Sequence, residues 1–195
     1  MRVIAGKFRS RPLKTLKGAK LRPTSDRLRE TLFNILGAGV AGSVFVDAFA
    51  GSGAVGIEAI SRGAREVIFI ESHRTAIEMI RRNLRSLGIV LGAEVLTADA
   101  VAGLDYLAGR GRRAELVFLD PPYERGVDYM RTLRFLDTSR LLDPGGIVVV
   151  EHARTRRGGE SEFDALPDTL KRLERTRVVE QGSAVLSFFC LRRMP

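Results

Sequence analysis

LVFLDPPY, residues 116–123, is the stretch that decides how this chain folds. Its first four residues form a continuous apolar run, which is typical of a strand buried on both faces in a parallel sheet. Pro121 and Pro122 donate no hydrogen bond to a sheet, so they predict a stiff corner directly after Asp120. Carboxylate and carbonyl acceptors would there lie beside the ring of Tyr123, a combination that suits a planar group with an exocyclic amine, such as a nucleobase. A plain turn after a strand is the alternative.

A glycine-rich turn follows a second apolar run, Val44-Phe45-Val46. This run ends at Asp47, and the chain then passes through Gly51, Gly53 and Gly56 into a predicted helix. Glycines permit positive φ and a close approach of a ligand to the backbone, and the start of a helix exposes unpaired N–H groups. The spacing G-x-G-x-x-G also fits dinucleotides, so it does not choose between cofactors.

Predicted strands and helices alternate along most of the chain, and an acidic residue ends each of five strands. This order predicts an α/β fold with a doubly wound, Rossmann-like sheet, mostly parallel, whose strands bring these acids to one edge. The hairpin 172–191 would close the sheet antiparallel, and 143–146 (DPGG) reads as a turn. The five acids are Asp47, Glu71, Asp99, Asp120 and Glu151.

Two of these acids also have simpler interpretations. Glu71 ends the strand after the glycine turn, where a carboxylate can bind both hydroxyls of a ribose, although it could be a surface acid. Asp99 is placed to bind the amine of an adenine or to cap the helix that follows it. The chain carries two histidines, His73 and His152, and neither has a companion at a spacing that suggests a metal site or a Ser-His-Asp triad.

The net charge of +9 is concentrated in the first 22 residues, since the first acid is Asp26 and the rest of the chain is nearly neutral. A cationic arm of this kind favours a polyanion, and the phosphates of a nucleic acid are the first candidate. A solvated tail that only aids solubility is the alternative. Apolar residues in the arm and SRP at 10–12 predict a short hairpin. The cations among these 22 residues are Arg2, Lys7, Arg9, Arg11, Lys14, Lys17, Lys20 and Arg22.

A helix is predicted to start near Thr24 or Ser25, either of which can cap it, and to end near Gly37. Its apolar stripe leaves Arg27, Arg29 and Glu30 on the other side. A single cysteine, Cys190, excludes an internal disulfide and favours a reducing cytoplasm. Neither a membrane span nor a signal peptide is apparent, and we expect a soluble, cytoplasmic monomer that uses no metal.

Several of these motifs together resemble a known family. DAFAGSG at 47–53, Glu71, Asp99 and DPPY at 120–123, in that order, are similar to S-adenosylmethionine-dependent methyltransferases that act on amino nitrogens of bases. RVIAG at 2–6, LRPTSDR at 21–27 and RETLFN at 29–34 resemble the RsmD family, which methylates the N2 amine of a guanine in small-subunit (16S) ribosomal RNA. The resemblance extends from residue 2 to about residue 151, with a weaker echo at 183–191.

The resemblance implies roles for individual residues. Residues 1–22 would form a basic RNA-binding arm and residues 23–195 the methyltransferase domain. The substrate would be 16S rRNA within a 30S subunit or an assembly intermediate, and Asp120, Pro121, Pro122 and Tyr123 would hold the extruded guanine. Adenine-N6 methylation of DNA or another RNA, a nicotinamide enzyme and a non-catalytic RNA-binding assembly factor stay open as alternatives. The cofactor would be held by Thr24, Asp47, Phe49, Ala50, Gly51, Ser52, Gly53, Glu71, Asp99 and Ala100, and the RNA by Arg2, Lys7, Arg9, Arg11, Arg22 and Arg27.

Overall fold

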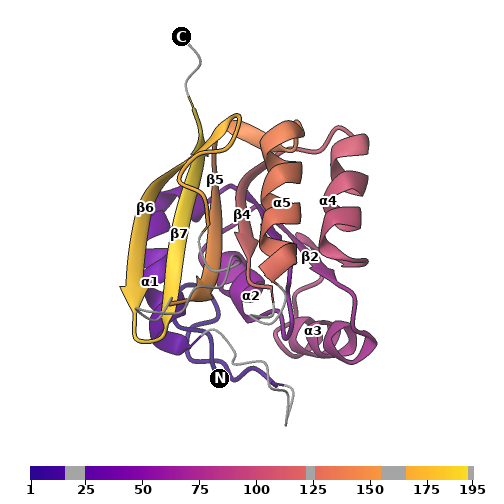
Figure 1. Ribbon diagram of the computed structural model, residues 1–195. Helices are drawn as coiled ribbons and strands as arrows, with labels where there is room; N and C mark the ends of the chain where they lie inside the picture. The colour runs from indigo at the N-terminus through magenta and orange to yellow at the C-terminus, as the bar shows by residue number, and fades with distance from the viewer. Residues whose placement is uncertain (16–24, 122–125, 155–165, 193–195) are drawn as a thin grey trace.

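A seven-stranded sheet in the order β3-β2-β1-β4-β5-β7-β6 lies at the centre of the computed structural model, which describes residues 1–15, 25–121, 126–154 and 166–192 (Figure 1). The first five strands are parallel, and β7 pairs antiparallel with both β5 and β6. The predicted doubly wound α/β fold with an antiparallel C-terminal hairpin is confirmed. The strands are β1 Val44–Asp47, β2 Glu66–Glu71, β3 Ala93–Thr97, β4 Ala114–Leu119, β5 Leu142–Ala153, β6 Leu173–Gln181 and β7 Ala184–Leu191.

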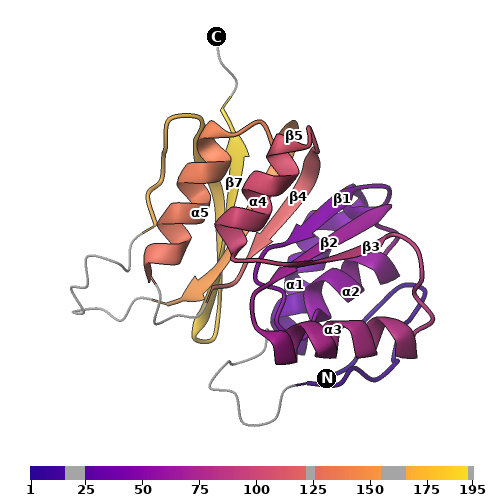
Figure 2. The same ribbon diagram turned by 90° about the vertical axis from the view of Figure 1, so that its right-hand side faces the viewer.

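Helices cover both faces of the sheet (Figure 2). One apolar cluster joins α1, α2 and α3 to one face, and a second joins α4 and α5 to the other. In the part of the chain that the structure describes, no helix is long and apolar enough to cross a bilayer. The helices are α1 Asp26–Leu36, the 3-10 turn η1 Gly37–Val40, α2 Ala54–Ser61, α3 Arg74–Ser86, α4 Ala100–Gly109 and α5 Gly126–Thr138.

Local sequence signals place most element boundaries. Ser25 caps α1, since its Oγ accepts the Leu28 N–H at 3.1 Å, and the helix ends at Gly37, whose φ is +53°. The strands β1, β2 and β4 are almost fully buried, as expected of continuous apolar runs between two helical layers. Gly182, with φ +65°, allows the tight connection between β6 and β7.

Two predictions about local structure are wrong. The predicted turn at 143–146 does not end a strand: β5 runs through it, and the pairing with β4 shifts register there. The sequence places Arg29 off the apolar stripe of α1, but its side chain is fully buried. Its Nη2 donates to the backbone oxygen of Arg2 at 2.5 Å, because the first residues of the chain fold over this side of the helix.

Candidate active site

Carboxylates of neighbouring parallel strands meet at one edge of the sheet. Asp47 lies opposite Phe69 of β2 and Phe118 of β4, so Glu71 and Asp120 follow two residues later on the two flanking strands. Leu119 pairs with Val150, which places Glu151 level with Asp120 on β5. The predicted convergence of acids at the carboxyl ends of the strands is confirmed for these four strands, the usual position of a ligand site in such a sheet.

The glycine turn connects β1 to α2 at the same edge. Gly51 and Gly53 have φ of +53° and +78°, which a side chain would strain. A Cβ at Gly51 would meet no described atom within 4 Å, so the space beside the turn is open at this point. A Cβ at Gly56 would lie 2.3 Å from Cε1 of Phe69, so this glycine lets α2 pack closely on β2.

Asp47 lies beneath the turn. Its carboxylate is buried and accepts the N–H of Gly56 at 3.0 Å, which ties the end of β1 to the first turn of α2. The pKa of Asp47 is raised to about 7: burial is the main cause, the hydrogen bond from Gly56 lowers the pKa, and the negative charge of Glu71 adds to the rise. Asp47 therefore supports the turn from inside the protein.

Glu71 joins the turn after β1 to the turn after β2. Its Oε2 accepts the Gly51 N–H at 2.8 Å, and its Oε1 accepts the His73 N–H at 2.8 Å. The side chain is buried, which makes the surface interpretation wrong. Each carboxylate oxygen can accept a second hydrogen bond, so these contacts are compatible with the predicted ribose-binding role.

Asp99 is exposed at the start of α4 and caps it, since its Oδ1 accepts the Val101 N–H at 3.1 Å. The capping role is confirmed, and the predicted contact with an adenine amine stays a prediction. Ala100 is buried beneath it. In the glycine turn, Phe49 is half-buried and Ala50 is buried.

The corner after β4 is held by a residue that the sequence did not single out. Asp120 is half-buried and Pro121 is buried, and the Pro121 carbonyl accepts a hydrogen bond from the Tyr129 hydroxyl of α5 at 3.3 Å. The available signal was a tyrosine in the first turn of the helix that follows the corner. Pro122 and Tyr123 lie outside the described residues, as do Thr24 and Arg22.

The N-terminal arm, residues 1–15 of the described chain, is built into the fold. It turns back on itself through an antiparallel bridge between Arg2 and Pro12, in agreement with the predicted hairpin. Val3 and Leu13 are buried in the core cluster of α1, α2 and α3. Five cations have exposed side chains: Arg2, Lys7, Arg9, Arg11 and Lys14. The four within residues 2–11 are called the arm cations.

Glu58 of α2 fastens the beginning of the arm. Its carboxylate accepts the N–H groups of Ile4 at 2.7 Å and Ala5 at 2.9 Å and the Nε–H of Arg62 at 2.8 Å. The buried Arg29 guanidinium lies 3.8 Å away and balances the charge. Burying a carboxylate costs free energy unless its oxygens keep their hydrogen-bond donors. Moving Ile4 and Ala5 away from Glu58 would break two of these bonds, so the arm is held at this end.

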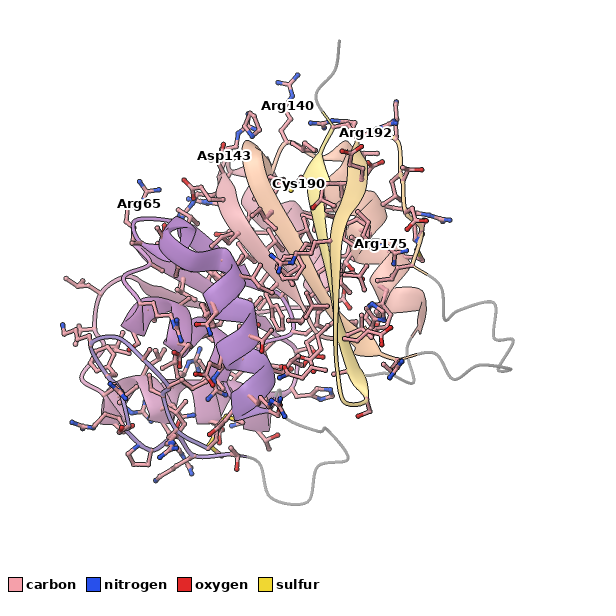
Figure 3. All side chains as sticks on the ribbon, turned by 90° about the vertical axis from the view of Figure 1, so that its left-hand side faces the viewer. Arg65, Arg140, Asp143, Arg175, Cys190 and Arg192 are labelled. Carbon is pink, nitrogen blue, oxygen red and sulfur yellow. The ribbon has the colours of Figure 1, made fainter. Side chains whose placement is uncertain are left out.

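Exposed arginines also occur far from the arm. Figure 3 shows Arg140 and Arg192 at the opposite pole of the sheet, near Asp143. The arm, by contrast, lies beside α3, at the end of the molecule where β5 ends (Figures 1 and 2). Arg27 of α1 is exposed as well. At this end of the sheet the arm is accompanied by two other exposed arginines, Arg74 at the start of α3 and Arg154 directly after β5. Over the described ranges, no three or more His, Cys, Asp or Glu side chains are grouped as ligands for a metal ion.

Residues 1–189 match the model of a protein family described as "Conserved hypothetical protein 95". The chain belongs to this family. The match covers the arm as well as the sheet, and it confirms the resemblance to the RsmD family.

Relatives that carry a name are described as methyltransferases. Bacillus subtilis YlbH, named as a candidate rRNA methyltransferase, is 39% identical over 183 residues, which are 93% of this chain and 94% of YlbH. Ribosomal RNA small subunit methyltransferase D of Escherichia coli K12 is 37% identical over 151 residues, 77% of this chain and 74% of that protein. The solved structure of Escherichia coli yhhF, described as a candidate methyltransferase, superposes with a TM-score of 0.81 at 32% identity, covering 98% of this chain and 97% of that one.

Proposed function

We propose that this protein transfers a methyl group from S-adenosylmethionine to the exocyclic N2 amine of a guanine in 16S ribosomal RNA, within a 30S subunit or an assembly intermediate. The family and the names of its relatives make it an S-adenosylmethionine-dependent rRNA methyltransferase. The observation that carries the finer proposal is the position of the glycine turn and the Asp120-Pro121 corner. They follow the adjacent strands β1 and β4, and Asp47 at the end of β1 pairs with Phe118, the residue before the last one of β4.

The described residues fit the cofactor. The open space beside Gly51 leaves room for a ligand against the backbone, and Glu71 lies at the next strand end with two acceptor oxygens. The proposal assigns the turn from Asp47 to Gly53 to the methionine part, Glu71 to the ribose and Asp99 to the adenine, with Thr24 as a further contact. When bound, S-adenosylmethionine supplies an activated methyl group on a sulfonium, so the protein's main task is to position the acceptor.

The corner would orient the amine. A guanine amine is a weak nucleophile because its lone pair is delocalised into the ring. Asp120 and the Pro121 carbonyl would accept its two N–H groups, which localises the lone pair and aims it at the methyl carbon. A carbonyl oxygen has two lone pairs, so the bond from Tyr129 is compatible with a second one from the amine. Tyr123 would stack on the extruded base.

The arm would dock the RNA. The arm cations lie on exposed side chains of a segment whose backbone is fixed to the core, so their charge is presented from a defined position. A fixed cationic surface beside the active edge would attract phosphates and orient the nucleotide to be modified. In the proposal, Arg22 and Arg27 extend this surface.

The test is Asp120→Ala, with Asp105→Asn on the exposed side of α4 as the matched control. We expect methyl transfer to 30S particles from a strain that lacks the activity to fall about 10²–10³-fold in the first variant, with binding of S-adenosylhomocysteine retained. The control should match the wild type. Undiminished transfer by the Asp120 variant would refute the role of the corner.

Mapping the labelled nucleoside by mass spectrometry separates guanine-N2 from adenine-N6 methylation. Calorimetry with NAD and S-adenosylmethionine tests the nicotinamide alternative, which offers no role for the corner. If the protein binds 30S particles and cofactor but transfers no methyl group to 30S particles, DNA or another RNA, it is instead an assembly factor.

A further inference from the structure

One buried amide joins the arm to the glycine turn. The side chain of Asn83 on α3 is 1% exposed. Its Oδ1 accepts the backbone N–H of Lys14 at 2.9 Å, and its Nδ2 donates to the backbone oxygen of Lys14 at 3.0 Å and to that of Ser52 at 3.0 Å. Both amide hydrogens are therefore used, one on the arm and one on the turn that precedes α2.

The same face of α3 supports the turn by packing. Ile80 lies one helical turn before Asn83, and its Cγ1 is 3.2 Å from the position of a Cβ at Gly53. A leucine at position 83 would fill a similar volume without the cost of burying an amide. Because the polar side chain contacts backbone atoms only, its effect does not depend on the side chains of Lys14 and Ser52. A shift of the backbone at Ser52 would therefore affect the backbone at Lys14 through Asn83.

The two ends of the arm are bound by different helices, and the arm backbone also pairs them with each other, since the Leu13 N–H donates to the Met1 oxygen at 3.0 Å. The N–H groups of Ile4 and Ala5 are bound by Glu58 of α2, whereas Lys14 is bound by Asn83 of α3. Near Asn83, the arm also contacts α3 through Arg11, whose Nη2 donates to the Ser86 oxygen at 3.4 Å. The amides of Ile4 and Ala5, which are bound by Glu58, therefore serve as an internal reference for a change that spreads from the glycine turn through Asn83.

We propose that Asn83 is a positioning residue that couples the RNA-binding arm to the cofactor turn. A cofactor that orders the turn fixes the Ser52 carbonyl, and Asn83 then holds the arm at Lys14 more firmly. By reciprocity, RNA that fixes the arm strengthens cofactor binding. This inference rests on the proposed function, because it assumes that the turn binds S-adenosylmethionine and that the arm binds RNA.

The experiment measures backbone amide hydrogen exchange by NMR on the full chain, with and without S-adenosylhomocysteine. In the wild type we expect the ligand to slow exchange at Gly51 and Gly53 and to slow exchange of the Lys14 amide about two- to tenfold, the range for one hydrogen bond. The amides of Ile4 and Ala5 should not change. If the ligand slowed exchange at the turn but not at Lys14 in the wild type, this result would by itself overturn the coupling.

Two variants locate the coupling. Asn83→Ala removes all three bonds, so the ligand should still protect the turn but should no longer slow Lys14, and the ligand Kd should rise about two- to tenfold. Asn83→Asp keeps the acceptor for the Lys14 N–H and loses both amide donors, to the Lys14 and Ser52 oxygens, so Lys14 should be protected without ligand and show no ligand response. Glu78→Gln, on the exposed side of α3, is the matched control and should behave as the wild type.

The outcomes separate this inference from the proposed function. Absence of protection at the turn means that the cofactor does not bind there, which overturns the function and the coupling together. Protection at the turn with a ligand response at Lys14 that persists in either Asn83 variant leaves the function intact and overturns the role of Asn83. If Asn83 were only a structural residue, Asn83→Ala would lower the Tm, but the ligand would still slow exchange of the Lys14 amide.

Discussion

Replacing Asp47 by Asn should change how stability depends on pH. Asp47 is buried, and its pKa is raised from an ordinary 3.8 to about 7, chiefly by burial and further by Glu71. The unfolded chain loses this proton near pH 4 while the folded protein keeps it to about pH 7. The stabilising contribution is therefore complete below pH 4 and is lost as the pH rises through 7. One pKa unit corresponds to ~1.4 kcal/mol, so the loss approaches ~4 kcal/mol above pH 8.

The Asp47→Asn variant removes this titration and keeps an oxygen that can accept the Gly56 N–H. Its stability relative to the wild type should increase by roughly 2–4 kcal/mol between about pH 4 and pH 8. For a chain of this size that corresponds to a relative rise in Tm of roughly 5–15 °C, measured by calorimetry at both pH values. Asp105→Asn makes the same charge change on an exposed side chain and is the control. A difference between Asp47→Asn and wild type that is the same at both pH values would refute the account of Asp47.

Three further predictions concern the corner, the turn and the arm. Tyr129→Phe loses the bond to the Pro121 carbonyl and should lower kcat for methyl transfer about two- to tenfold with an unchanged Kd for S-adenosylhomocysteine; an unchanged kcat would contradict it. Gly56→Ala should lower the free energy of unfolding in urea by about 1–3 kcal/mol, because the new methyl group meets the Phe69 ring. Gly109→Ala, with open space around it, should be nearly neutral. Equal effects of the two substitutions would argue against tight packing at Gly56. Replacing the four arm cations by Gln should lower rRNA affinity in filter binding and flatten its salt dependence by roughly 0.7–0.9 per lost phosphate contact; an unchanged slope would remove the arm from the RNA interface.

Substitution of the arm cations tests the arm better than its removal does. Val3 and Leu13 belong to the core, and Glu58 and Asn83 both bind the arm backbone. A deletion would therefore uncover apolar surface and leave buried polar groups without partners. Side-chain substitutions change the charge and keep these contacts.

Most of the fold follows from local features of the sequence. Continuous apolar runs marked the buried strands, and glycines marked the turns that need positive φ. Because parallel strands that alternate with helices share a carboxyl edge, the acids at their ends could be placed together without a structure. Residues 143–146 are instead part of β5, because β4 pairs with Leu142 before them and with Ile147 after them, and this pairing depends on the neighbouring strand.

The sequence by itself determined the order of the elements, the glycine turn, the acids at the strand ends and the basic character of the arm, since periodicity, turn preferences and charge act over a few residues. Tertiary structure alone decided the burial of Arg29, the contact of Tyr129 with the Pro121 carbonyl and the bridge made by Asn83. These contacts join backbone and side-chain groups from different elements, and burial strongly favours such polar pairing. No pattern within one element reports which distant carbonyl a buried side chain will meet.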